Sequence, residues 1–170
     1  MQNPQLSCAI RCPVYCSVCR QAIAFNKRRE MRAIESTAGM GEISVVRILV
    51  ADDSPAIRSC LRGLLDHHAD WLVCDEASNG KEAVERFLEA KPDLIVIDFQ
   101  MPEMNGLDAA RHIVGLSPKT PILMVTIHLS KQLSQEARKV GIRGACAKGD
   151  IHSVVDAVGA LLREETYFPN

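Results

Sequence analysis

Three acidic side chains follow two apolar segments of the chain. Asp52 and Asp53 come directly after the run Val46–Ala51, and Asp98 closes the run that starts at Asp93. In an open parallel α/β sheet the crevice lies outside the carboxyl ends of the strands, so acids in these positions gather there. Carboxylates that lie together repel one another unless they share a cation. Oxygen ligands of this hard type predict a site for Mg²⁺ or Mn²⁺.

Each acid taken alone has a simpler explanation. Asp and Ser are favoured N-cap residues, and Pro55 suits the first turn of a helix, so Asp53, Ser54 or Asp98 could each cap a helix or begin a loop. The presence of all three acids at strand ends favours the metal site over local capping.

Two further polar residues stand at the ends of apolar segments. Thr126 closes the run from Ile122, and Lys148 follows the segment Gly144–Ala147. Alone, each has a plainer reading, as a strand threonine or a surface lysine. Because right-handed crossovers bring the ends of parallel strands to one edge, we expect a hydroxyl and an ammonium group beside the acids. Such a group suits phosphoryl transfer, in which a carboxylate attacks phosphorus while cations and hydroxyls contact the phosphoryl oxygens.

The elements that must position these residues are short apolar runs that alternate with amphipathic stretches of helical period. Turn signals such as Asn79-Gly80 and Lys91-Pro92 separate them. We therefore predict five βα units in an α/β fold with a doubly wound parallel sheet. The predicted strands are 46–51, 72–76, 94–98, 121–126 and 144–147. The predicted helices are 55–67, 80–90, 107–116, 131–140 and 151–163.

Composition favours a soluble protein with one domain of about 120 residues and an extension. The chain has 170 residues, 47% of them hydrophobic, and a net charge of −1. We find no apolar run of about 18 residues and expect no membrane association. Residues 1–40 hold six basic and two acidic residues, which leaves fourteen basic and nineteen acidic ones in residues 41–170. An acidic domain with few aromatic residues predicts no direct DNA binding.

Four cysteines crowd the first twenty residues: Cys8, Cys12, Cys16 and Cys19. The spacing of the last three resembles the cluster-binding signature of radical S-adenosylmethionine enzymes, but the remaining sequence does not supply the barrel which that family needs. A four-cysteine zinc site is the other metal reading, with little chain between the ligand pairs. We instead expect residues 1–44 to be a disordered or misassigned N-terminal extension, with Met31 or Met40 as the true start.

The polar residues stand in four short motifs: Val50-Ala51-Asp52-Asp53-Ser54, Asp98-Phe99-Gln100-Met101-Pro102-Glu103-Met104-Asn105-Gly106, Val125-Thr126 and Ala147-Lys148. These motifs resemble the receiver domain of bacterial two-component response regulators. The resemblance covers about residues 46 to 163 and implies a flavodoxin-like (βα)5 fold with strand order 2-1-3-4-5. It implies a receiver domain over residues 45–165, followed by a C-terminal tail at 166–170.

The resemblance also implies a role for each residue of the site. Asp98 matches the phosphoacceptor, and Thr126 and Lys148 match the switch hydroxyl and the lysine that contact the phosphoryl group. The ligands implied for Mg²⁺ are Asp52, Asp53, Asp98 and the backbone carbonyl of Gln100.

A receiver of this kind implies a cytoplasmic signalling protein, which catalyses only its own phosphoryl transfer and dephosphorylation. Its partners would be a histidine kinase or phosphotransfer protein and an unknown output protein, with a phosphorylation-dependent dimer left open. We expect the output surface to be formed by residues 131–140, 144–147 and 151–163. The subgroup resembled usually carries a LuxR-type DNA-binding domain, so the chain is either a single-domain receiver or a truncated regulator.

One residue departs from the family pattern. Ala145 stands where an aromatic side chain is common, which puts the usual aromatic readout in question. His128 lies where the family tunes the dephosphorylation rate, although a solvated loop histidine is the simpler reading. Two other functions stay open: a pseudo-receiver that binds partners without phosphorylation, and a haloacid-dehalogenase-type phosphatase. The phosphatase needs Asp-x-Asp at the nucleophile, where this sequence has Asp98-Phe99-Gln100.

Overall fold

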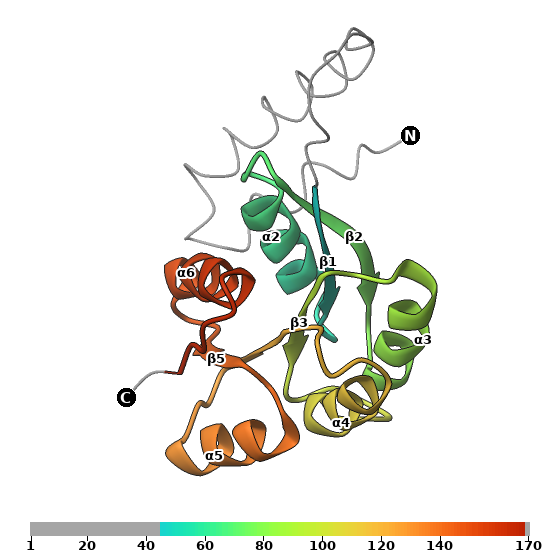
Figure 1. Ribbon diagram of the computed structural model, residues 1–170, viewed down its shortest axis with the longest axis vertical. Helices are drawn as coiled ribbons and strands as arrows, with labels where there is room; N and C mark the ends of the chain where they lie inside the picture. The colour runs from blue at the N-terminus through green and yellow to red at the C-terminus, as the bar shows by residue number, and fades with distance from the viewer. Residues whose placement is uncertain (1–44, 169–170) are drawn as a thin grey trace, which may run out of the picture.

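Five parallel strands form one sheet in the order β2-β1-β3-β4-β5, as predicted (Figure 1). The computed structural model describes residues 45–168, and the predictions for residues 1–44 therefore lie outside the described residues. The strands are β1 (Val46–Ala51), β2 (Trp71–Ala77), β3 (Leu94–Asp98), β4 (Ile122–Thr126) and β5 (Gly144–Ala147). The helices are α2 (Pro55–Leu65), α3 (Gly80–Ala90), α4 (Gly106–Leu116), α5 (Lys131–Val140) and α6 (Ile151–Leu162). The prediction of a doubly wound, flavodoxin-like α/β fold is confirmed.

Helices cover both faces of the sheet (Figure 1). Buried side chains of α3, α4 and α5 pack on one face, and those of α2 and α6 pack on the other. All five residues of β3 and all five of β4 are buried. Central parallel strands are covered on both sides, which explains why these two segments are almost wholly apolar in sequence.

Side-chain caps fix where four of the helices begin. The side chains of Asn79, Asn105, Ser130 and Asp150 each accept a hydrogen bond from a backbone N–H in the first turn of the helix that follows. These bonds satisfy donors that have no partner within the helix. Helix α4 therefore begins at Gly106, one residue earlier than predicted.

Other boundaries differ from the prediction by one or two residues. Helix α2 ends at Leu65 instead of residue 67, because the next residues form a turn in which the His68 N–H donates to the Leu65 carbonyl. Strand β4 begins at Ile122 instead of Pro121, which has no N–H to donate to a neighbouring strand. Strand β2 is one residue longer at each end than predicted, and α6 is one residue shorter.

The C-terminal segment adds a short contact to the edge of the sheet. Tyr167 forms a parallel bridge with Gly144 of β5. The Tyr167 N–H donates to the Arg143 carbonyl at 3.0 Å, and its carbonyl accepts from the Ala145 N–H at 2.7 Å. The guanidinium carbon of Arg138 in α5 lies 4.2 Å from the centre of the Phe168 ring. The predicted tail thus begins with residues that pair with the domain.

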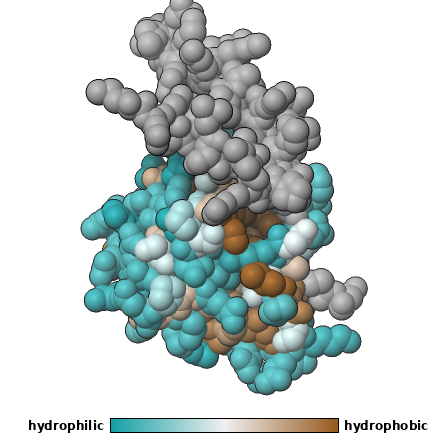
Figure 2. All heavy atoms as spheres, turned by 180° about the vertical axis from the view of Figure 1, so that it is seen from behind, coloured by the Kyte–Doolittle hydropathy of each residue, from teal (hydrophilic) through white to brown (hydrophobic). Residues whose placement is uncertain are grey.

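The described part of the chain contains no helix long and apolar enough to cross a membrane. Figure 2 shows one face of the molecule, on which hydrophilic side chains predominate and hydrophobic ones gather in a smaller area. Among the described residues, four large hydrophobic side chains are exposed: Leu72, Leu88, Leu116 and Ile127.

Candidate functional site

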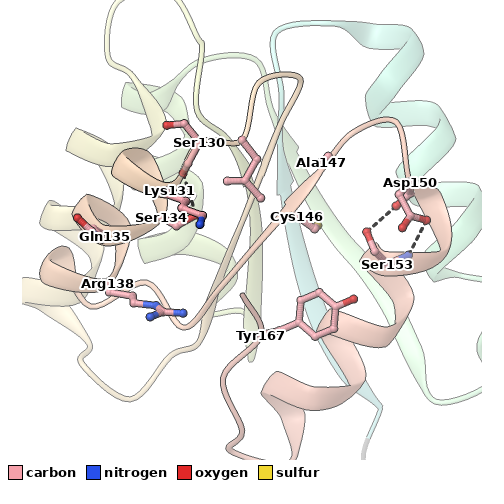
Figure 3. A pocket seen from close by; sticks show the side chains of 11 residues that line it. Ser130, Lys131, Ser134, Gln135, Arg138, Cys146, Ala147, Asp150, Ser153 and Tyr167 are labelled. Carbon is pink, nitrogen blue, oxygen red and sulfur yellow. Dashed lines mark hydrogen bonds between the residues drawn. The ribbon is translucent and has the colours of Figure 1, made fainter. Parts of the chain in front are cut away.

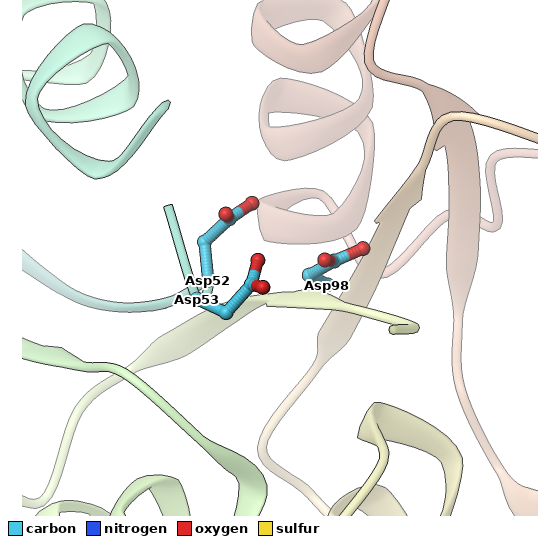
Figure 4. A group of neighbouring side chains, drawn as sticks. All are labelled: Asp52, Asp53 and Asp98. Atoms are coloured by element: carbon cyan, nitrogen blue, oxygen red, sulfur yellow. The ribbon is translucent and has the colours of Figure 1, made fainter. Parts of the chain in front are cut away.

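Three carboxylates meet at the carboxyl ends of β1 and β3 (Figure 4). One oxygen from each of Asp52, Asp53 and Asp98 lies within 4.8 Å of the other two. Asp52 and Asp98 are 1% and 4% exposed, whereas Asp53 is exposed to solvent. The grouping arises because β1 and β3 are neighbours in the sheet, with Ala51 opposite Ile97.

Asp52 is held at several points along its backbone and side chain. Its N–H donates to the Ala77 carbonyl at 3.0 Å, and its Oδ1 accepts from the Ser54 N–H at 3.0 Å. Its own carbonyl accepts from Nη1 of Arg58 at 2.6 Å. Apart from a contact with Lys148, its Oδ2 is buried without a hydrogen-bond partner among the described residues.

Lys148 joins two of the carboxylates. Its Nζ lies 2.6 Å from Asp52 Oδ2 and 2.8 Å from Asp98 Oδ2, and its side chain is 9% exposed. Its backbone N–H donates to the Thr126 carbonyl at 2.8 Å, which ties the residue after β5 to the end of β4. An ammonium group in this position offsets part of the repulsion between the two buried acids.

Burial and ion pairing act in opposite directions on the pKa of Asp98 and on the pKa of Lys148. Burial raises the pKa of Asp98 above its ordinary value, and the hydrogen bond and charge of Lys148 only partly counter this. Burial alone would lower the pKa of Lys148, but hydrogen bonds to Asp52 and Asp98 outweigh it and the pKa is raised. Lys148 therefore stays charged at neutral pH. A further cation beside Asp98 would favour the ionised form of that acid, which burial disfavours.

Two glycines bring the loop after β3 against the site. A Cβ on Gly106 would lie 2.0 Å from the Asp98 carbonyl oxygen, and a Cβ on Gly80 would lie 2.3 Å from that of Met104. The Gly106 N–H donates to the Phe99 carbonyl at 2.9 Å, which closes the loop. Only residues without a side chain allow this approach, so both glycines help to set where Asp98 and its loop lie.

The other predicted site residues take different places. Gln100 is exposed two residues after Asp98, at the start of the loop that follows β3. Thr126 is buried at the end of β4, next to Ala147 of β5. Ala145 is fully buried opposite Met124, and His128 is exposed. The structure thus brings Asp52, Asp53, Asp98 and Lys148 together and places Thr126 at the same sheet edge.

The donor set fits a hard divalent cation. Carboxylate oxygens are the ligands that Mg²⁺ and Mn²⁺ prefer, and a carbonyl or water can complete such a site. Three acids against one lysine leave the cluster with a net negative charge, which favours a cation there. The residues present therefore fit a magnesium site.

Sequence reasoning did not identify Arg58, although it contacts the backbone of the site. The only signal was a pair of arginines, Arg58 and Arg62, spaced one turn apart on a predicted helix. That spacing places both on one face but does not tell what the face meets.

A groove of about 530 Å³ lies apart from the acids, between α5 and α6 along β5 (Figure 3). Lys131, Ser134 and Arg138 line its α5 side, and Asp150 and Ser153 line its α6 side. Tyr167 and Cys146 also line the groove. Burial raises the pKa of the Cys146 thiol to about 11, which makes this cysteine an apolar core residue at neutral pH.

Comparison with known proteins agrees with this geometry. A family model described as the response regulator receiver domain matches residues 48–158. The chain is 36% identical over 102 residues to the chemotaxis protein CheY of Thermotoga maritima, a match that covers 60% of this chain and 84% of CheY. It is 31% identical over 124 residues to the uncharacterized transcriptional regulatory protein YxjL of Bacillus subtilis, which covers 72% of this chain and 57% of YxjL.

Solved structures give the same result. The crystal structure of a LuxR-family two-component response regulator from Aurantimonas superposes with a TM-score of 0.70 at 30% identity. The superposition covers 73% of this chain and 89% of that one.

Proposed function

The chain belongs to the response regulator receiver domain family of two-component systems, and we propose that Asp98 is its phosphoacceptor. The observation that carries the proposal is the cluster of Asp52, Asp53 and Asp98 with Lys148 in contact with two of them. A nucleophilic carboxylate beside a cation site and an ammonium group suits phosphoryl transfer, which depends mainly on positioning and charge neutralisation.

In the proposed reaction an oxygen of Asp98 attacks the phosphorus of a phosphohistidine. The new O–P bond forms as the N–P bond to the imidazole breaks, and the imidazole takes up a proton. Mg²⁺, held by Asp52, Asp53, Asp98 and the Gln100 carbonyl, would neutralise charge on the phosphoryl oxygens. Lys148, now paired with Asp98, would turn to a phosphoryl oxygen, and the buried Thr126 hydroxyl would contact another.

The proposed partners follow from this chemistry. A histidine kinase or phosphotransfer protein would donate the phosphoryl group in the cytoplasm, and an output protein would read the result. We propose the groove between α5 and α6 as the output surface, because Lys148 and Thr126 stand at the ends of β5 and β4 beside it. Residues 45–165 would make up the signalling domain.

Phosphorylation by acetyl phosphate tests the proposal. The native chain should gain a phosphoryl adduct, seen by intact mass, only when Mg²⁺ is present. Asp98→Asn should gain none, whereas the matched control Asp156→Asn, an exposed acid on α6, should react like the native chain. A native chain that binds Mg²⁺ but forms no adduct would contradict the proposal.

That last outcome would favour a second candidate, a pseudo-receiver that binds partners without phosphorylation. Ala145 is the observation in its favour, because a fully buried alanine cannot provide the side-chain rotation that an aromatic residue could. The same mass measurement separates the two candidates.

A further inference from the structure

Arg58 reaches from the first turns of α2 back to the loop that carries two acids of the site. Its Nη1 donates to the Asp52 carbonyl oxygen at 2.6 Å, and its Nε donates to Glu76 Oε2 at 3.1 Å. The Arg58 side chain is only 16% exposed. A guanidinium group that donates in two directions within a partly buried site is held in one orientation.

The oxygen that Arg58 contacts belongs to the peptide group between Asp52 and Asp53. A peptide group is planar, so a bond to its carbonyl oxygen also fixes the direction in which the chain enters Asp53. The Asp53 carboxylate itself forms no hydrogen bond or ion pair among the described residues, and its side chain is exposed. Its direction therefore depends on how its backbone is held.

We propose that Arg58 is a positioning residue for the cation site, acting through the Asp52–Asp53 peptide. By holding this peptide, Arg58 keeps the Asp53 carboxylate within reach of the cation shared with Asp52 and Asp98. The inference rests on the proposed function, because it assumes that the three acids hold Mg²⁺.

Glu76 holds the Arg58 guanidinium in place. Its two carboxylate oxygens accept separately, Oε2 from Arg58 and Oε1 from Arg62 at 2.5 Å. Glu76 lies in β2 opposite Val50 of β1, and Asp52 directly follows β1. The carboxylate that holds Arg58 therefore belongs to the strand that pairs with β1. The guanidinium thus links the rigid sheet to the loop.

Arg62 provides a matched control on the same helix. It pairs with the same Glu76, but its Nη1 donates to the Val73 carbonyl at 3.0 Å and has no contact with the loop that bears the acids. Its substitution removes one arginine charge and one bond to Glu76, as substitution of Arg58 does. The two arginines differ in the backbone carbonyl that each contacts, Asp52 for Arg58 and Val73 for Arg62, and in side-chain exposure, which is 16% for Arg58 and 40% for Arg62.

The test compares Mg²⁺ affinity, by isothermal titration calorimetry on the full chain, for the native protein, Arg58→Met and Arg62→Met. Residues that orient metal ligands without touching the metal change affinity by about tenfold or more when replaced, so R58M should bind about tenfold more weakly. R62M should bind as the native chain does. Urea denaturation should show a similar loss of stability in both variants, because each loses one bond to Glu76.

Arg58→Lys tests for partial rescue of Mg²⁺ affinity. Lysine keeps the charge and can donate to the Asp52 carbonyl, but it cannot also donate to Glu76 as a guanidinium group does. Its affinity should lie between those of R58M and the native chain. Should R58M fail to fold, Glu76→Gln tests the same anchor: the proposal expects weaker Mg²⁺ binding.

Two results would overturn the positioning role alone. The first is native-like Mg²⁺ affinity in R58M, or in E76Q if R58M does not fold. The second is an R62M variant whose Mg²⁺ affinity falls as much as that of R58M. In both cases the native chain still binds Mg²⁺ and still forms its phosphoryl adduct, so the proposed function stands. A native chain that does not bind Mg²⁺ would overturn the proposed function and this inference together.

Discussion

Lys148 contacts Asp98 across an intervening strand, with 2.8 Å between Nζ and Oδ2. Asp98 ends β3 and Lys148 follows β5, and β4 lies between these strands in the sheet. The long lysine side chain spans that gap and also meets Asp52. One ammonium group therefore holds together acids from two strands, and the stability of the site depends on its charge balance.

Removal of the ammonium group should destabilise the fold. Lys148→Met leaves two buried carboxylates without their shared partner, and we expect the free energy of unfolding to fall by about 3 kcal/mol without Mg²⁺. Added Mg²⁺ should restore part of the loss, because on the proposed function it binds the folded chain. Urea denaturation with and without Mg²⁺ measures both effects, and Lys131→Met, at an exposed lysine, is the control. A K148M variant as stable as this control would show that the ion pairs contribute little.

Neutralising Asp98 should have the opposite effect on stability. Burial raises the folded-state pKa of Asp98 above its ordinary value of 3.8, so the folded chain binds this proton more tightly than the unfolded chain. The corresponding stability is full below the unfolded pKa and is lost as pH rises through the folded pKa. Asp98→Asn is neutral at every pH and should avoid this loss.

In urea titrations without Mg²⁺, D98N should therefore be more stable than the native chain at pH 7. The difference should shrink as the pH falls toward 3.8, where Asp98 becomes protonated in both states. A variant less stable than the native chain at pH 7 would mean that pairing with Lys148 outweighs the cost of burying the charge.

The close approach of α4 to β3 should not tolerate a methyl group. Gly106→Ala places a Cβ 2.0 Å from the Asp98 carbonyl oxygen, a backbone atom that cannot move aside cheaply, and we expect a loss of about 2 kcal/mol or more. Gly115→Ala lies on the same helix with nothing within 4 Å. It should stabilise the chain by about 0.5 to 1 kcal/mol, because alanine favours helix. Denaturation curves for the two variants should move in opposite directions, and equal shifts would disprove the steric explanation.

Pairing of Tyr167 with β5 should protect the backbone at Ala145. A chain that stops after Thr166 loses both hydrogen bonds of Tyr167 and the packing of the Tyr167 and Phe168 side chains, which should cost about 2 kcal/mol or more and speed hydrogen exchange of the Ala145 amide. Phe168→Ala removes a ring that lies on Arg138 and packs against the core but keeps both Tyr167 hydrogen bonds, with an expected cost of about 1 to 2 kcal/mol. The Ala145 amide should stay protected in that variant, and fast exchange there would mean that the ring holds the segment in place.

Local sequence pattern was sufficient to predict the five strands and the helices between them. Alternating apolar runs and helical stretches predict βα units, and the receiver resemblance supplied the order 2-1-3-4-5 that the structure has. Element ends were less accurate, as at Leu65 and Gly106, because single turn and cap hydrogen bonds decide them. Those bonds depend on local geometry that a hydrophobic period does not describe.

The position of the acids after Val50-Ala51 and Ile97 was also visible in the sequence, since parallel strands end at one edge of the sheet. Which groups touch was not visible. The contact of Lys148 with two acids and the pairing of Tyr167 with β5 join segments far apart in the chain, and the contact of Arg58 with the nearby Asp52 carbonyl depends on how α2 is oriented. They arise from the twist of the sheet and from the rotation of each helix upon it, and only the packed tertiary structure sets these.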